Sequence, residues 1–99
     1  MQVKIQSIHF TADNKLEEFI GEKLTKLNSR FDQIISSEVT LRLEKSATRE
    51  NKISEIKLMI PGNDLFAKKQ SKTFEEAIDL AIDALKTQIN KRKRRVKPA

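Results

Sequence analysis

The chain has 99 residues, of which 37% are hydrophobic and 34% charged, with two Gly, two Pro and no Cys. This composition indicates one folded domain with a modest core, and it excludes a disulfide framework or a thiolate site. No stretch approaches the roughly 20 apolar residues of a membrane span, and the N-terminus lacks the apolar run of a signal peptide, so a cytoplasmic location is expected.

The formal net charge of +6 is concentrated at the C-terminal end of the chain. Residues 1–83 hold 13 Lys and Arg against 14 Asp and Glu, whereas residues 84–99 hold seven basic residues and no acidic one. Such an asymmetry favours an anionic partner. The alternative at this stage is a solvated, lysine-rich end that binds nothing.

The N-terminal part of the chain predicts a strand followed by a helix. In "QVKIQSIHF", Val3 and Ile5 share one face of an alternating pattern, which is typical of a strand. Thr11 is expected to cap the next helix by accepting a hydrogen bond from a free amide. The apolar stripe of that helix recurs at three- and four-residue steps and consists of Leu16, Phe19, Ile20, Leu24, Leu27 and Phe31.

Three more strands are predicted by the alternation in "EVTLRLEK" and "KISEIKLMIPG" and, more weakly, in "DLFAKKQSK". The polar stretch "SATREN" separates the first two, and Pro61-Gly62 is a turn signal before the third. Because the connections are short, the three strands are expected to form an antiparallel meander.

The segment "TFEEAIDLAIDALKTQI" predicts a second helix, and "NKRKRRVK" is expected to form its end plus a short arm. Thr73 and Glu76 have the spacing of a capping box. Acidic residues near the start and basic residues near the end suit the helix dipole. The apolar stripe consists of Phe74, Ala77, Ile78, Ala81, Ile82, Leu85 and Ile89.

The order β-α-β-β-β-α predicts an α+β fold. The first two strands are joined through a helix, so they are expected to be parallel with a right-handed crossover. Each helix has one apolar stripe and each strand one mostly apolar face. Both helices are therefore expected to pack on one face of a four-stranded mixed sheet and to leave the other face open.

The inventory of reactive residues argues against an enzyme. His9 is the one histidine, and no neighbour in the sequence could complete a metal or nucleophilic site with it. Two glycines cannot build a phosphate-binding loop. We therefore expect no catalytic residue, no metal and no cofactor.

Binding to an RNA backbone remains, because basic arrays on helices suit phosphates. Exposed aromatic residues are scarce, because most of the Phe residues fall on apolar stripes and Phe66 is the one expected on the open face of the sheet. This scarcity disfavours a module that stacks bases on the sheet. The charged candidates on the outer faces of the two helices are Lys23, Lys26, Arg30, Lys86, Lys91, Arg92, Lys93, Arg94 and Arg95.

The stretches "VKIQS", "KLTKL", "VTLRLE", "IPGNDLFA" and "FEEAIDLAIDALKTQINK" resemble the ribosome hibernation promoting factor family, also called the ribosome-associated inhibitor or sigma-54 modulation family. The resemblance covers nearly the whole chain and implies a fold similar to a double-stranded-RNA-binding domain. The family usually has Asp-x-Tyr where this chain has Lys72-Thr73-Phe74, and Thr87 stands where an Arg is common. Because the chain stops at Ala99, it resembles the short members.

The resemblance implies a factor that binds the small ribosomal subunit between head and body. There it would block messenger and transfer RNA and silence translation in starvation or stationary phase. Its partners would be small-subunit RNA and neighbouring ribosomal proteins, with no membrane or small-molecule substrate, and it would be monomeric off the ribosome. Residues 1–95 would be the single ribosome-binding domain and 96–99 a short tail. The contacts implied by position are Lys23, Lys26, Lys86, Gln88, Lys91 and Lys93.

Two other interpretations stay open. A generic double-stranded-RNA-binding domain would have a similar fold but no preference for ribosomal subunits over a plain duplex. A non-RNA module using the polar sheet face as an oligomer interface would show binding that hardly responds to salt.

Overall fold

The computed structural model describes residues 2–44 and 49–96, with the side chains described as far as Arg92. The elements are β1 (Gln2–Ile8), α1 (Asn14–Arg30), β2 (Ser36–Leu43), β3 (Lys52–Ile60), β4 (Asn63–Ser71) and α2 (Phe74–Val96). The sheet order is β1-β2-β3-β4, with β1 parallel to β2 and the later pairs antiparallel. The predicted order, mixed sheet and meander are therefore confirmed.

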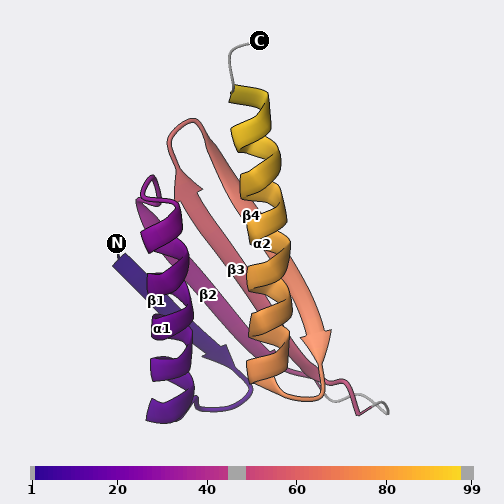
Figure 1. Ribbon diagram of the computed structural model, residues 1–99. Coiled ribbons are helices and arrows are strands. Elements are labelled where there is room, and N and C mark those ends of the chain that lie inside the picture. The colour runs from indigo at the N-terminus through magenta and orange to yellow at the C-terminus, as the bar shows by residue number, and fades with distance from the viewer. Residues whose placement is uncertain (1, 45–48, 97–99) are drawn as a thin grey trace.

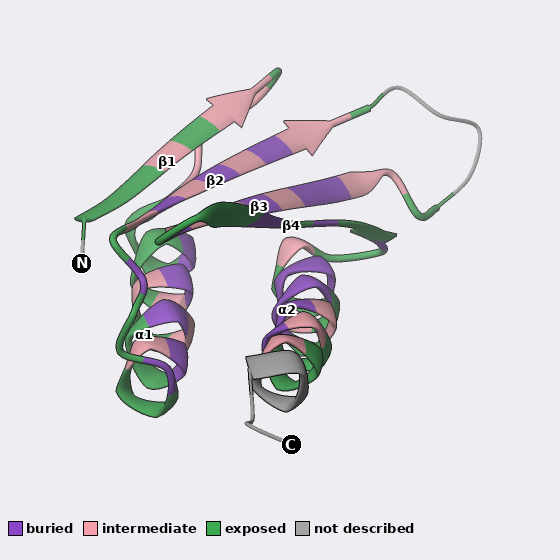
Figure 2. Cartoon of the chain, turned by 90° about the horizontal axis from the view of Figure 1, so that it is seen from above, coloured by how far each residue is buried: buried purple, intermediate pink, exposed green. Residues whose placement is uncertain are grey.

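Both helices cover the same face of the sheet, and the opposite face is left open, as predicted (Figures 1 and 2). They lie side by side and run in the same direction, so both C-terminal ends point toward the β3–β4 turn (Figure 1). This arrangement follows from the connections, because the crossover from β1 to β2 and the link from β4 to α2 both bring the chain back along the sheet.

The core lies between the sheet and the two helices. Alternate residues of the central strands point into it, so Val39, Leu41, Ile56 and Leu58 are buried while their neighbours are more exposed. The helices contribute their predicted stripes, of which the largest fully buried members are Ile20, Leu24, Ile78 and Leu85. At about 25 cal/mol per Å² of apolar area, this burial is the main favourable term in folding.

Phe10 and Phe74 close the core at the end where both helices begin. Their rings stack with centroids 4.4 Å apart and an angle of 12° between the planes. Both side chains are only partly buried and pack against the main core. The contact joins the β1–α1 connection to the first turn of α2. Phe74 stands where a Tyr is usual, and this packing role needs the ring but not the hydroxyl group of a Tyr.

The turn between β3 and β4 explains the Pro61-Gly62 signal. Ile60 pairs with Asn63, so the loop has two residues, and Gly62 has a φ of 85°. A side chain is strained at this φ, whereas proline at the preceding position fixes its own φ near −65°. The combination is typical of a type II turn.

The cap of α1 differs from the prediction: it is Asp13 and not Thr11. The Oδ1 atom of Asp13 accepts a hydrogen bond of 2.8 Å from the backbone N–H of Leu16. The helix begins at Asn14, so Thr11 lies two residues too early to reach the free amides. The expected cap of α2 is confirmed, because the hydroxyl of Thr73 accepts from the N–H of Glu76 at 3.1 Å.

Replacing Asp13 by alanine should lower the free energy of unfolding by about 0.5–2 kcal/mol, because one amide of the first turn of α1 loses its acceptor. The matched change Thr11→Ala should stay within about 0.5 kcal/mol of the wild type. Urea denaturation followed by circular dichroism measures both. Equal losses for the two variants would contradict the assigned cap.

Candidate nucleic-acid interface

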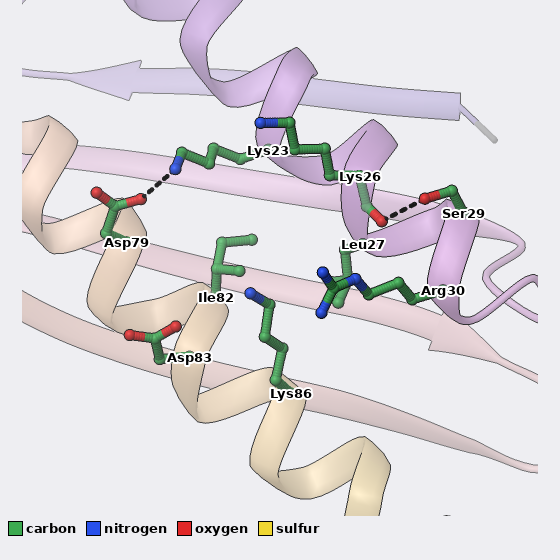
Figure 3. A pocket seen from close by; sticks show the side chains of 9 residues that line it. All are labelled: Lys23, Lys26, Leu27, Ser29, Arg30, Asp79, Ile82, Asp83 and Lys86. Atoms are coloured by element: carbon green, nitrogen blue, oxygen red, sulfur yellow. Dashed lines mark hydrogen bonds and ion pairs between the residues drawn. The ribbon is translucent and has the colours of Figure 1, made fainter.

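A groove runs between the two helices on the side away from the sheet. We call it the interhelix groove; Figure 3 shows the residues that line it, which are Lys23, Lys26, Leu27, Ser29 and Arg30 from α1 and Asp79, Ile82, Asp83 and Lys86 from α2. Its floor is apolar, since Leu27 and Ile82 belong to the core. A second hollow lined by Arg30, Lys86 and Asn90 continues it toward the C-terminal ends of both helices.

The spacing of the charged residues explains why they line this groove. On each helix they recur at three- and four-residue steps directly beside the buried stripe, which places them on one flank. Because the helices are parallel neighbours, the flank of α1 faces the flank of α2. Two rows whose facing members, such as Arg30 and Lys86, lie 56 positions apart in the chain therefore form one surface.

Arg30 and Lys86 point into the groove from opposite helices, over Leu27 and Ile82 (Figure 3). Within residues 2–44 and 49–92, neither side chain forms an ion pair with a carboxylate. The dipole of α1 accounts for a cation in its last turn, but Lys86 is well before the end of α2, where this effect has faded. Two converging cations are unfavourable alone and favourable around an anion.

The remaining cations of the groove are arranged differently. Lys23 is held by an ion pair with Asp79, whose Oδ1 lies 3.1 Å from Nζ, and it also lies 5.3 Å from the ring centroid of Phe19. Lys26 is exposed, and its ammonium points away from α2 (Figure 3). Lys26 therefore extends the basic surface over the outer side of α1.

Gln88 and Arg92 contact the β3–β4 hairpin instead of the groove. Gln88 Nε2 donates to the carbonyl of Phe66 at 2.8 Å, and Arg92 Nη2 donates to the carbonyl of Pro61 at 2.8 Å. Along an antiparallel hairpin, hydrogen-bonded residue pairs alternate with pairs that are not hydrogen-bonded to each other. Phe66 and Lys57 form a pair of the second kind, so the carbonyl of Phe66 points away from β3, to the outer edge of β4. The two side chains thus anchor the second half of α2 and cover part of a sheet edge.

The other predicted contacts lie on the last turns of α2. Lys91 is exposed and does not line the interhelix groove. Lys93, Arg94 and Arg95 lie in the helix, but their side chains are outside the described residues. The predicted set is therefore divided into groove residues, hairpin anchors and the cationic end of the helix.

Asp79 and Asp83 also line the groove, although neither was among the predicted site residues. Their signal was present, because the four- and three-residue steps from Asp79 to Asp83 to Lys86 run beside the buried Ile82. The partner of Lys23 could not be found from sequence, since its identity depends on how the two helices are aligned.

Ion pairs within the sheet neutralise several charges on its open face. Arg42 and Glu55 lie 3.7 Å apart, and Lys57 and Asp64 lie 3.5 Å apart. Phe66 is half exposed on this face, as expected. Because cations and carboxylates alternate there, the open face is less suited to a run of phosphates than the groove. No helix in the described part of the chain is long and apolar enough to cross a membrane.

Comparisons with known proteins agree with this architecture. The profile of the family described as "Sigma 54 modulation protein / S30EA ribosomal protein" matches residues 3–97. A ribosome hibernation promoting factor of Pseudomonas putida is 33% identical over 93 residues, which cover 94% of this chain and 87% of that protein. The protein of the same name from Escherichia coli K12 is 31% identical over 97 residues, or 98% of each chain.

Solved structures show the same fold. A ribosomal subunit interface protein from Coxiella burnetii superposes with a TM-score of 0.85 at 22% identity, covering 95% of this chain and 99% of its own. The N-terminal domain of Thermus thermophilus Protein Y gives 0.77 at 22% identity, covering 92% and 98%.

The fold and the groove define a small α+β protein with a basic groove between two parallel helices. The chain belongs to the sigma 54 modulation protein / S30EA ribosomal protein family, in which its relatives are ribosome hibernation promoting factors.

Replacing Gln88 by alanine should lower the free energy of unfolding by about 0.5–1.5 kcal/mol, because the hydrogen bond to the Phe66 carbonyl is lost. The neighbouring change Lys91→Ala, at an exposed position of the same helix, should have little effect. Urea denaturation distinguishes them. A Gln88 variant as stable as the Lys91 variant would show that the anchor contributes nothing to the fold.

Proposed function

We propose that this protein is a ribosome hibernation factor that binds the small ribosomal subunit in the decoding channel. By filling that channel it would block messenger and transfer RNA and silence translation during starvation or stationary phase, in the cytoplasm. The names of its relatives support the ribosomal role. The observation that carries the binding surface is the convergence of Arg30 and Lys86 on the interhelix groove.

The chemistry of the groove favours recognition of an RNA backbone over recognition of bases. Its walls carry long basic side chains together with Asp79 and Asp83, and its floor is aliphatic; among the described residues that line it, none is aromatic. Lysine and arginine neutralise phosphates and release counterions, which supplies affinity without reading sequence. A rigid fold that presents such a surface can recognise the shape of folded RNA, which suits a ribosomal site.

The cationic end of α2 would extend this surface. Its five consecutive basic residues, from Lys91 to Arg95, repel one another in the free protein. Phosphates opposite them would relieve that repulsion. In this proposal residues 1–95 form the ribosome-binding domain, in which Gln88 and Arg92 hold α2 against the β3–β4 hairpin. The partner is small-subunit RNA together with neighbouring ribosomal proteins.

Neutralising both converging cations, with Arg30→Gln and Lys86→Gln, should weaken binding to isolated small subunits. It should also flatten the dependence of log affinity on log salt by about 1.4–1.8, since two phosphate contacts are lost at about 0.7–0.9 each. The measurement is a binding titration at several salt concentrations, paired with inhibition of cell-free translation.

A matched control carries Lys4→Gln and Lys68→Gln, which remove the same charge from the open face of the sheet. If the control lost as much affinity as the groove variant, net charge and not the groove would drive binding. Competition by a plain RNA duplex as strong as that by small subunits would instead favour the generic double-stranded-RNA-binding domain.

A further inference from the structure

The ion pair between Lys23 and Asp79 crosses the interhelix groove, at some distance along it from Arg30 and Lys86 (Figure 3). The two side chains are 35% and 50% exposed, so the pair lies at the solvent surface of the groove. Lys23 is held from two sides, by Asp79 of the other helix and by the ring of Phe19 on its own. In the described part of the chain, Arg30 and Lys86 are not held by an ion pair with a carboxylate in this way.

We propose that Asp79 sets how tightly the groove holds RNA phosphate, and that it keeps the complex reversible. Its carboxylate oxygen lies 3.1 Å from the Lys23 ammonium, in the place where a phosphate oxygen would bind. Asp79 therefore competes with phosphate for Lys23 and repels phosphate at the same time. This inference rests on the proposed function, since it concerns affinity for small-subunit RNA.

A phosphate can compete with Asp79 for Lys23 because the ion pair between them is exposed to solvent. A buried ion pair would be costly to break, but an exposed one contributes little and is screened by salt. A phosphate can therefore displace Asp79 from Lys23, although the displaced carboxylate stays nearby. Because the pair is neutral as a unit, it adds no net attraction to a groove that already holds Arg30 and Lys86.

Asp83 acts in the same direction. It lies one turn after Asp79 on α2 and lines the same groove. In the described part of the chain it forms no ion pair, so its charge remains available to repel an approaching phosphate. Two carboxylates within a basic groove would limit affinity on the α2 side.

Such a limit should appear mainly in the rate of dissociation. Variants of one interface usually differ more in their off-rates than in their on-rates. A factor that silences ribosomes must leave when growth resumes, and a groove in which every cation was free would release RNA slowly. Asp79 would therefore favour release at the expense of maximal affinity.

The test measures dissociation of labelled protein from isolated small subunits at several salt concentrations. Asp79→Asn should slow dissociation about two- to fivefold and steepen the salt dependence by about 0.7–0.9, since Lys23 becomes available to a phosphate. Lys23→Gln should do the opposite. The variant carrying both changes should dissociate at nearly the wild-type rate, because the pair is again neutral.

The matched control is Glu38→Gln, which makes the same charge change on the open face of the sheet, away from the groove. If this control slowed dissociation as much as Asp79→Asn, net charge would explain the effect and the inference would be wrong. Unchanged or faster dissociation of the Asp79 variant, with an unchanged melting temperature, would overturn the inference. Faster dissociation would show that Asp79 instead positions Lys23 for RNA. A wild-type protein that does not bind small subunits would overturn the proposed function itself.

Discussion

The parallel packing of α1 and α2 on one face of the sheet is the constraint on which the rest of the structure depends. It buries both apolar stripes against the same face of the sheet, with Leu24 and Leu27 on α1 and Ile82 and Leu85 on α2. Since the helices run in the same direction, residues at equivalent heights meet across the groove (Figure 1). An antiparallel arrangement of the same two sequences would separate Arg30 from Lys86.

The same packing organises the electrostatics. Both helix C-termini lie toward one end of the molecule, so their negative dipole ends favour cations there, and both first turns contain acidic residues. The body of the chain is nearly neutral, yet its cations are not evenly spread. On the open face Arg42 and Lys57 are paired with carboxylates, and among the described residues Lys4 and Lys68 form no ion pair. In the groove, Arg30 and Lys86 converge from opposite helices without a carboxylate partner in the described part of the chain. Local arrangement, more than net charge, therefore distinguishes the two faces.

Much of the fold could be predicted from the sequence because the periodic signals are strong and agree with one another. The stripes of both helices, the meander and the shared helix face all follow from patterns of two or of three and four residues. The cap of α1 was predicted wrongly at Thr11, since Thr and Asp are both good caps and packing decides that the helix begins after Asp13. The consecutive burial of Ile53 and Ser54 also departs from the alternation of a strand.

The candidate site was less predictable than the fold, because charge alone does not show where a side chain is directed. Arg92 has the same charge as Arg30, yet it donates to the carbonyl of Pro61. Gln88 likewise anchors the hairpin. Asp79 looked like an ordinary acidic residue near the start of a helix, and only the alignment of the helices places it against Lys23. These distinctions depend on contacts between distant segments.

Directed hydroxyl-radical cleavage would test most directly that the groove faces ribosomal RNA. The chain has no cysteine, so Ser29→Cys provides a single attachment point for an iron chelate in the groove, and Gln6→Cys provides one on the open face. With the proteins bound to small subunits, we predict strong cleavage of RNA in the decoding channel from position 29 and weak cleavage from position 6. Stronger cleavage from position 6 would contradict the assignment of the groove as the binding surface.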